Sequence, residues 1–191
     1  YNLLMFDLRT HGQSEGTNIS FGYYEQNDID AAIDYLKKRD RTLIKNLGVL
    51  AHSMGAATAV FAATRRKEIK EMTLICCYAE IEKDMEYWAT HFAHLPYWPF
   101  VAIGIKTFQK EIYPDLKKVS PIFYVPKLKI PLFFIHSVND ELTNPQSSKR
   151  LFDVAKGKKD LWFVPKAFHE TFFDAAPEEF SKRVKDFFKL Y

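Results

Sequence analysis

Short apolar segments of four to six residues recur along the chain, and none alternates cleanly between apolar and polar side chains. A strand covered on both faces has this pattern, because both rows of its side chains are buried. We therefore predict five buried strands. They are Leu3–Phe6, Leu47–Leu50, Met72–Cys77, Leu132–His136 and Leu161–Val164.

Helical patterns lie between these strands. Residues 29–36 place apolar side chains at i, i+3, i+4 and i+7, with charges on the other face. Residues 56–63 are alanine-rich and apolar nearly all round, as in a buried helix. The last helix is expected to begin at Pro177, with two glutamates in the first turn, where the helix dipole favours acids. Strands alternating with helices predict an α/β fold with a mainly parallel sheet flanked by helices.

Residues 79–126 interrupt the alternation with a stretch rich in aromatic side chains. We predict a helical cap insertion here, within a single domain of residues 1–191 whose core is residues 1–78 and 127–191. We expect the aromatic side chains to line a pocket for an apolar substrate group. The alternative is that they only pack the cap onto the core. The candidates for substrate binding are Tyr87, Trp88, Phe92 and Trp98.

The composition is that of a globular protein with a high aromatic content. Of the 191 residues, 47% are hydrophobic, 27% charged and 16% aromatic. The net charge is +3 and the basic residues are scattered, so we expect no nucleic-acid partner. Membrane association is not indicated within this chain, because no apolar run approaches the roughly 20 residues that span a bilayer.

Two adjacent cysteines, Cys76 and Cys77, lie in an apolar run. Neighbours in a strand point to opposite faces, so these two are not expected to form a disulfide with each other. They are typical of buried thiols in a reducing compartment. Because the sequence starts on a core-like segment rather than a signal segment, we predict a cytoplasmic location, which depends on whether a signal or anchor precedes Tyr1.

One strand ends abruptly in a serine. Residues 51–55 read Ala-His-Ser-Met-Gly, which follows the nucleophile-elbow pattern of small residues two positions to either side of a serine. A sharp strand-to-helix turn of this kind exposes the hydroxyl of Ser53 at the strand end. A serine needs a neighbouring base and an acid that orients the base. Without these the pentapeptide is only a strand-to-helix connection.

A base and an acid follow two later strands. Asp140 lies in a polar loop after one predicted strand, and His169 lies in a loop after the last. Because functional groups of parallel sheets gather at the carboxyl ends of the strands, Ser53, Asp140 and His169 are predicted to form a catalytic triad. Each alone has a simpler interpretation, since loop aspartates cap turns and loop histidines are solvated.

Other side chains compete for these roles. Glu141 is the substitute acid if Asp140 faces away. His136 lies within a strand and His52 within the elbow, so both are interpreted as structural. His91 and His94 are spaced as a metal pair but have no acidic or cysteine partner at ligand spacing, so we predict no metal site.

Together these motifs resemble the alpha/beta-hydrolase superfamily, in its serine esterase, thioesterase and peptidase-like branch. The resemblance covers the whole chain except the cap. It implies an acyl-enzyme mechanism without cofactors, with the backbone N–H of Met54 in the oxyanion hole. The matching segments are Ala51–Gly55, Asp7–Ser14 (with Thr10 in place of a glycine), Gly22–Asp28, His136–Asp140 (with Ser137 in place of a glycine) and Val164–His169.

The resemblance also implies that three strands and a helix precede the segment with which this sequence begins. One of those strands would lie between Leu3–Phe6 and Leu47–Leu50, and the loop after it would supply a second oxyanion donor. Our expectation is therefore that the chain is N-terminally incomplete. Two alternatives stay open: Leu3–Phe6 pairs directly with Leu47–Leu50, or the chain has lost catalysis.

The function predicted from the sequence is a serine hydrolase that cleaves a carboxylic ester or thioester with an apolar portion. The nearest alternative is a peptidase of the same fold. A second alternative is a catalytically impaired binding module that retains the fold.

Overall fold

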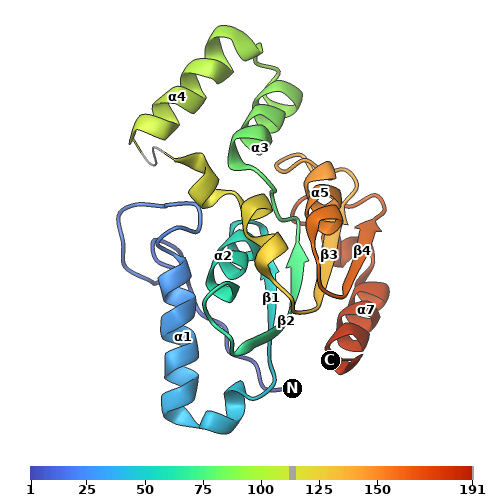
Figure 1. Cartoon of the computed structure of the whole chain (residues 1–191). Helices are drawn as coiled ribbons and strands as arrows, with labels where there is room; N and C mark the ends of the chain where they lie inside the picture. Colours follow the sequence, from blue (N-terminus) through green and yellow to red (C-terminus); the bar gives the residue numbers. More distant parts are fainter. Residues whose placement is uncertain (112–114, 191) are drawn as a thin grey trace.

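Four parallel strands form one sheet in the computed structural model, which describes residues 1–111 and 115–190 (Figure 1). Their order in the sheet is the order in the chain, β1-β2-β3-β4. The predicted α/β class with a parallel sheet is confirmed. The strands are β1 Leu47–His52, β2 Ile69–Ile75, β3 Leu132–Ser137 and β4 Lys159–Val164.

Helices connect the strands and cover both faces of the sheet. The longer ones are α1 Gln26–Arg39, α2 Ser53–Ala63, α3 Ile81–Tyr87, α4 Ala102–Glu111, α5 Gln146–Val154 and α7 Pro177–Leu190. Shorter helical segments are η1 Arg41–Ile44, η2 Trp88–Phe92, η3 Tyr97–Val101, η4 Leu116–Val119, η5 Pro121–Phe123, η6 Val125–Lys127 and α6 Phe172–Ala175. The predicted helices within residues 29–36 and 56–63 and after Pro177 are therefore present.

Strand β3 shows why the apolar runs do not alternate. Leu132 and Phe134 belong to the core cluster that also contains residues of α1, α2 and α5. Phe133 and Ile135 belong to the cluster on the opposite face, which contains residues of α7. Successive side chains of a strand point to opposite faces, so a strand with helices on both sides is apolar at every position.

The predicted strand at Leu3–Phe6 is wrong. Residues 1–8 form no strand, and Leu3 and Met5 are 86% and 89% exposed. Strand β1 is an edge of the sheet among the described residues, so the alternative in which Leu3–Phe6 pairs with it is also wrong. An apolar run becomes a strand only when a neighbouring strand accepts and donates its backbone hydrogen bonds.

The other strands are confirmed with shifted ends. Strand β2 runs over Ile69–Ile75 rather than Met72–Cys77. Cys76 has φ +47°, in the left-handed region, so the extended conformation stops there. The strand predicted from Leu161 begins at Lys159, because register with β3, rather than apolarity, decides where pairing starts.

The segment Asp7–Ser14 is a turn anchored to α1. The guanidinium of Arg9 donates hydrogen bonds to the carboxylate of Asp28, and the backbone N–H of Arg9 donates to it at 3.0 Å. Thr10, which stands where the resembling motif has a glycine, has φ +65°. A β-branched residue is strained in this region, whereas glycine is not.

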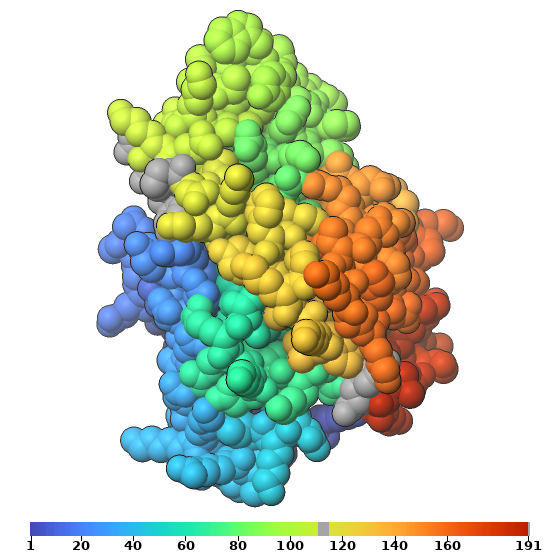
Figure 2. All heavy atoms as spheres, viewed as in Figure 1, coloured from blue at the N-terminus to red at the C-terminus, as the bar shows by residue number. Residues whose placement is uncertain are grey.

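Helices α3 and α4 stand at the carboxyl end of the sheet, away from both chain termini (Figure 1). Figure 2 shows this part of the chain as a lobe that projects from the body. Asp84 of α3 fixes the lobe to the core: its buried carboxylate accepts hydrogen bonds from the N–H of Asn144 at 2.8 Å and the hydroxyl of Ser147 at 2.9 Å. The cap predicted for residues 79–126 crosses 112–114, which lie outside the described residues, and its role stays a prediction.

Within residues 1–111 and 115–190, every helix is too short or too polar to pass through a bilayer.

Candidate active site

Ser53 lies at the junction of β1 and α2, as the elbow pattern predicts. Its φ is +53°, a left-handed value that a non-glycine residue adopts only when the surrounding structure imposes it. The sharp turn lets the strand end and the helix start at neighbouring residues. Apart from its chain neighbours and the backbone of its own helix, a Cβ added at Gly55 would meet no atom of the described residues within 4 Å.

The structure brings the three predicted triad residues together. His169 Nε2 lies 2.9 Å from Ser53 Oγ, and His169 Nδ1 lies 2.8 Å from Asp140 Oδ2. Asp140 and His169 are each 1% exposed, whereas Ser53 is partly exposed. The arrangement is a continuous hydrogen-bonded chain from a partly accessible hydroxyl to a buried carboxylate.

Asp140 remains ionised at neutral pH despite its burial. Burial raises the pKa of this carboxyl, but hydrogen bonds from His136, from His169 and from the backbone of Thr143 outweigh it and hold the pKa well below its usual range. Oδ1 accepts the N–H groups of Leu142 at 2.9 Å and Thr143 at 2.7 Å, and Oδ2 accepts the Thr143 hydroxyl at 2.9 Å. An ionised acceptor here requires that His169 Nδ1 carry a proton, which leaves Nε2 free to accept from Ser53.

Glu141 takes a different place from Asp140. Its Oε2 accepts the backbone N–H of His169 at 3.1 Å, so it holds the loop rather than the ring. The side chain that faces the imidazole is therefore Asp140, and the substitute acid is not needed.

The elbow histidine supports the same loop. His52 Nε2 lies 3.1 Å from the carbonyl oxygen of His169, and the two rings are 4.8 Å apart. Burial, followed by the nearby charge of His169, lowers the pKa of His52, while Glu170 opposes the shift. This placement agrees with the structural role predicted for His52.

The four aromatic candidates are not equivalent. The Tyr87 hydroxyl donates to the backbone carbonyl of Asp140 at 3.0 Å, which connects α3 with the loop that holds the carboxylate. Trp88 and Phe92 pack against each other with ring centroids 6.2 Å apart. Phe92 and Trp98 are 55% and 72% exposed. Only for Tyr87, among these four, does the described structure give a contact with the triad loops.

Sequence reasoning missed Thr143. Its N–H and hydroxyl both donate to Asp140, its hydroxyl lies 3.4 Å from His169 Nδ1, and it is buried. The available signal was the spacing, because an aspartate that accepts backbone N–H groups two and three residues later forms a common turn.

Two groups of side chains have donor atoms close enough to be considered as metal ligands. They share Cys76, and their atoms lie within 4.8 Å of one another. Burial raises the pKa of the Cys76 thiol to about 12, so it remains protonated and is a poor ligand. His91 and His94 belong to neither group. The groups are His52, Cys76 and His169, and Cys76, His136 and Asp140.

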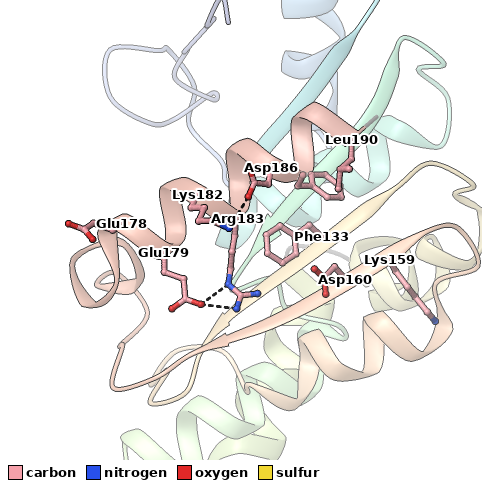
Figure 3. Close-up of a pocket in the computed structure, with 10 residues that line it drawn as sticks. Phe133, Lys159, Asp160, Glu178, Glu179, Lys182, Arg183, Asp186 and Leu190 are labelled. Atoms are coloured by element: carbon pink, nitrogen blue, oxygen red, sulfur yellow. Dashed lines mark hydrogen bonds and ion pairs between the residues drawn. The ribbon is translucent and has the colours of Figure 1, made fainter.

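A pocket of about 690 Å³ lies elsewhere, between α7 and the sheet (Figure 3). Phe133, Lys159 and Asp160, which line it, stand near the starts of β3 and β4. The triad residues follow the carboxyl ends of their strands. The pocket therefore lies at the opposite end of the sheet, where the strands begin. Its rim is already paired in part, since Arg183 and Glu179 form an ion pair. We therefore do not assign the candidate site to this pocket.

Comparison with known families agrees with the observed fold. A family model described as serine aminopeptidase, S33, matches residues 1–120. The chain belongs to the S33 family of alpha/beta hydrolases. A second family model, described as PhoPQ-activated pathogenicity-related protein, matches residues 72–191.

Individual relatives extend the comparison. The uncharacterized protein YqkD of Bacillus subtilis is 29% identical over 98% of this chain. The Pyrococcus furiosus esterase Pf2001 superposes with a TM-score of 0.81 at 28% identity, over 100% of this chain and 71% of the esterase. The acylaminoacyl peptidase of Pyrococcus horikoshii shares the fold, with a TM-score of 0.68 at 19% identity over 89% of this chain and 28% of the peptidase. The chain spans about three fifths of the length of the curated relatives it matches, 62% for YqkD.

Proposed function

We propose that this chain carries the site of a serine hydrolase that cleaves a carboxylic ester or thioester. The observation that carries the proposal is the hydrogen-bonded chain from Ser53 through His169 to Asp140. A hydroxyl that donates to a histidine, whose other nitrogen donates to a buried carboxylate, is the arrangement that activates a serine.

The proposed reaction has two halves. Ser53 Oγ attacks the acyl carbon while His169 Nε2 takes the hydroxyl proton, and the proton then goes to the departing alcohol or thiol. A water molecule next attacks the acyl-enzyme, losing its proton to His169, which returns the proton to Ser53 as the acid leaves. Asp140 remains ionised throughout and stabilises the imidazolium that forms in each half.

The oxyanion of each tetrahedral intermediate needs hydrogen-bond donors. The backbone N–H of Met54 lies in the first turn of α2, where N–H groups have no acceptor within the helix and the dipole favours negative charge. We propose Met54 as one donor. A single missing donor costs about 10²- to 10³-fold in turnover, so the number of donors present will govern the rate.

We propose an apolar acyl or alcohol portion for the substrate. The lobe that stands at the carboxyl end of the sheet carries Trp88, Phe92 and Trp98 on its exposed surface, and Tyr87 connects it with the triad loops. Apolar and aromatic linings favour apolar ligands. The similarity to an esterase at 28% identity supports an ester rather than an amide.

A covalent fluorophosphonate probe tests the hydrolase proposal. We expect it to label the wild-type protein and not the Ser53→Ala variant, because the probe reacts only with an activated serine. The variant should keep its far-UV circular dichroism, so that a loss of label is not a loss of fold. A folded wild-type protein without label would refute the hydrolase and favour the binding module.

Peptidase activity is the second candidate, and the matching family description, serine aminopeptidase, favours it. A panel of p-nitrophenyl esters of increasing acyl length, measured beside aminoacyl anilides, separates the two. We expect faster turnover of the esters. A preference for anilides would replace the esterase with the peptidase.

A cytoplasmic location is also part of the proposal. Cys76 and Cys77 are free and buried, which is typical of a reducing compartment. Cell fractionation of the native protein tests it.

A further inference from the structure

His136 of β3 is a buried histidine that the proposed reaction does not use. It is 0% exposed, and its Nε2 lies 3.2 Å from Asp140 Oδ2, the oxygen that also faces His169. Its Nδ1 lies 2.6 Å from the hydroxyl oxygen of Ser148 on α5. Asp140 is thus placed between two imidazoles, of which only one reaches Ser53.

The hydrogen-bond partners determine which nitrogen of His136 carries the proton. Asp140 accepts from two backbone N–H groups and a hydroxyl, so it is ionised. A bare nitrogen facing an ionised carboxylate would be repelled, so Nε2 carries a proton and donates it to Asp140. Nδ1 is then the acceptor, and the Ser148 hydroxyl donates to it.

We propose that His136 is a positioning residue that sets the basicity of His169 by acting through Asp140, with Ser148 fixing its tautomer. This inference rests on the proposed function of the site. The N–H of His136 stabilises negative charge on Oδ2, so less of that charge is available to hold a proton on His169. Asp140 therefore accepts less strongly from His169 Nδ1 than it would without His136.

Donors other than His136 also hold the carboxylate of Asp140, which separates the proposed role from a purely structural one. The N–H groups of Leu142 and Thr143 hold Oδ1, and the Thr143 hydroxyl holds Oδ2. Removal of the His136 donor should therefore leave the carboxylate in place while making it a stronger acceptor for His169. The expected consequence is a rise in the pH at which His169 is half protonated.

Other titratable groups face this cluster, and their protonation must be distinguished from that of His169. The raised pKa values of Cys76 and Tyr87, due first to burial, keep both neutral. Glu141 is tied to the N–H of His169, and Asp84 to Ser147 and Asn144. His52, which faces Glu170 at 4.0 Å, titrates nearby and needs its own signal.

Histidine NMR gives a measurement that does not depend on turnover. In a Ser53→Ala background, with ¹⁵N-labelled histidines assigned by His52→Gln and His169→Gln, the titration midpoint of His169 can be followed. We expect His136→Phe to raise this midpoint by about 0.5 to 1 pH unit, as loss of a competing donor to a neighbouring charge predicts. Ser148→Ala should give a smaller shift of the same sign, because it removes only the hydrogen bond that fixes the tautomer of His136.

Ser147→Ala is the matched control. Ser147, like Ser148, is a buried serine of α5, but its hydroxyl donates to the carboxylate of Asp84 instead of to His136. Its loss therefore removes a buried hydrogen bond without touching Asp140 or His136. It should leave the His169 midpoint unchanged. With Ser53 intact, the acid limb of the probe-labelling rate should shift in the same variants by the same amounts.

The proposal is overturned if the midpoint in His136→Phe or Ser148→Ala stays where it is in Ser147→Ala, or falls. If His136→Phe does not fold, Ser148→Ala decides. Failure of the wild-type protein to react with the probe would instead refute the hydrolase proposal, while the NMR titration would still judge the role of His136.

Discussion

Replacement of Asp140 by asparagine keeps the size of the side chain but exchanges one acceptor oxygen for a donor amide. The carbonyl of Asn will take the place of Oδ1, because the backbone N–H groups of Leu142 and Thr143 can only donate. The hydroxyl of Thr143 and the imidazole of His136, which face Oδ2, can also accept. The new NH₂ then faces His169 Nδ1 across the 2.8 Å contact. The imidazole must turn its lone pair towards the amide, so the proton moves to Nε2.

This tautomer removes the base from Ser53. Nε2, 2.9 Å from Ser53 Oγ, would now donate a hydrogen bond instead of accepting one. In serine proteases the same exchange lowers turnover by about 10⁴-fold, which corresponds to about 5 kcal/mol of barrier. We expect the second-order rate of fluorophosphonate labelling to fall by at least about 10³-fold.

The assay compares labelling rates of the wild-type, Asp140→Asn and Glu141→Gln proteins at one pH, with thermal melting as a check on folding. A glutamine at 141 can still accept the N–H of His169, so only the charge of the acceptor is lost. Because that charge is at the loop and not at the imidazole, the rate should change by less than about threefold. A folded Asp140→Asn protein that labels within tenfold of wild type would refute the reasoning. A larger loss in Glu141→Gln would transfer the role of the acid to Glu141.

Four further predictions concern stability and are measured by urea denaturation. Thr10→Gly should raise the free energy of unfolding by about 0.5 to 1 kcal/mol, because φ +65° costs an L-residue about 1 to 2 kcal/mol and glycine little; a fall would contradict the strain. Phe134→Ala, at 0% exposure, should cost roughly 3 to 5 kcal/mol, whereas Trp98→Ala, at 72% exposure, should change stability by less than about 0.5 kcal/mol. Tyr87→Phe should cost about 1 kcal/mol by leaving a backbone carbonyl without its donor, and no change would mean that the hydroxyl bond is not formed. The pKa of Asp140 is lower in the folded than in the unfolded state, so its ionisation stabilises the fold above about pH 4 and this stabilisation is lost as the pH falls. The difference in free energy of unfolding between wild type and Asp140→Asn should therefore shrink from pH 7 to pH 3. A difference independent of pH would exclude this linkage.

Much of the fold could be predicted because its signals are local. The continuous apolar runs of β1 to β4 and the helical periodicity of α1 reflect which face each residue presents, and a short window is enough to see it. The elbow at Ser53 is equally local, since the turn is made by residues adjacent in the chain. The order of Ser53, Asp140 and His169 after three strands then predicted their meeting, because parallel strands end at one edge.

The features that the sequence left open, missed or predicted wrongly have a physical reason in common. Leu3–Phe6 has the composition of a strand, yet a strand requires a partner, and the sequence of four residues does not contain one. Whether Asp140 or Glu141 faces the imidazole depends on the orientation of their loop, which is fixed by contacts with His169 far along the chain. Thr143 and Ser148 carry no pattern that marks them as neighbours of the same carboxylate and its histidine.

The sequence by itself therefore determined four of the five predicted strands, the parallel sheet and the three residues of the candidate site, because each follows from side-chain periodicity or from position at a strand end. Only the tertiary structure decided how the protons are shared. Ser53 and His169 are 116 residues apart, and the hydrogen bonds that join them with Asp140, His136 and Ser148 connect five elements or loops. Whether a hydrogen bond forms depends on differences in distance of a few tenths of an ångström. The packing of the whole domain sets these distances, and no local pattern encodes them.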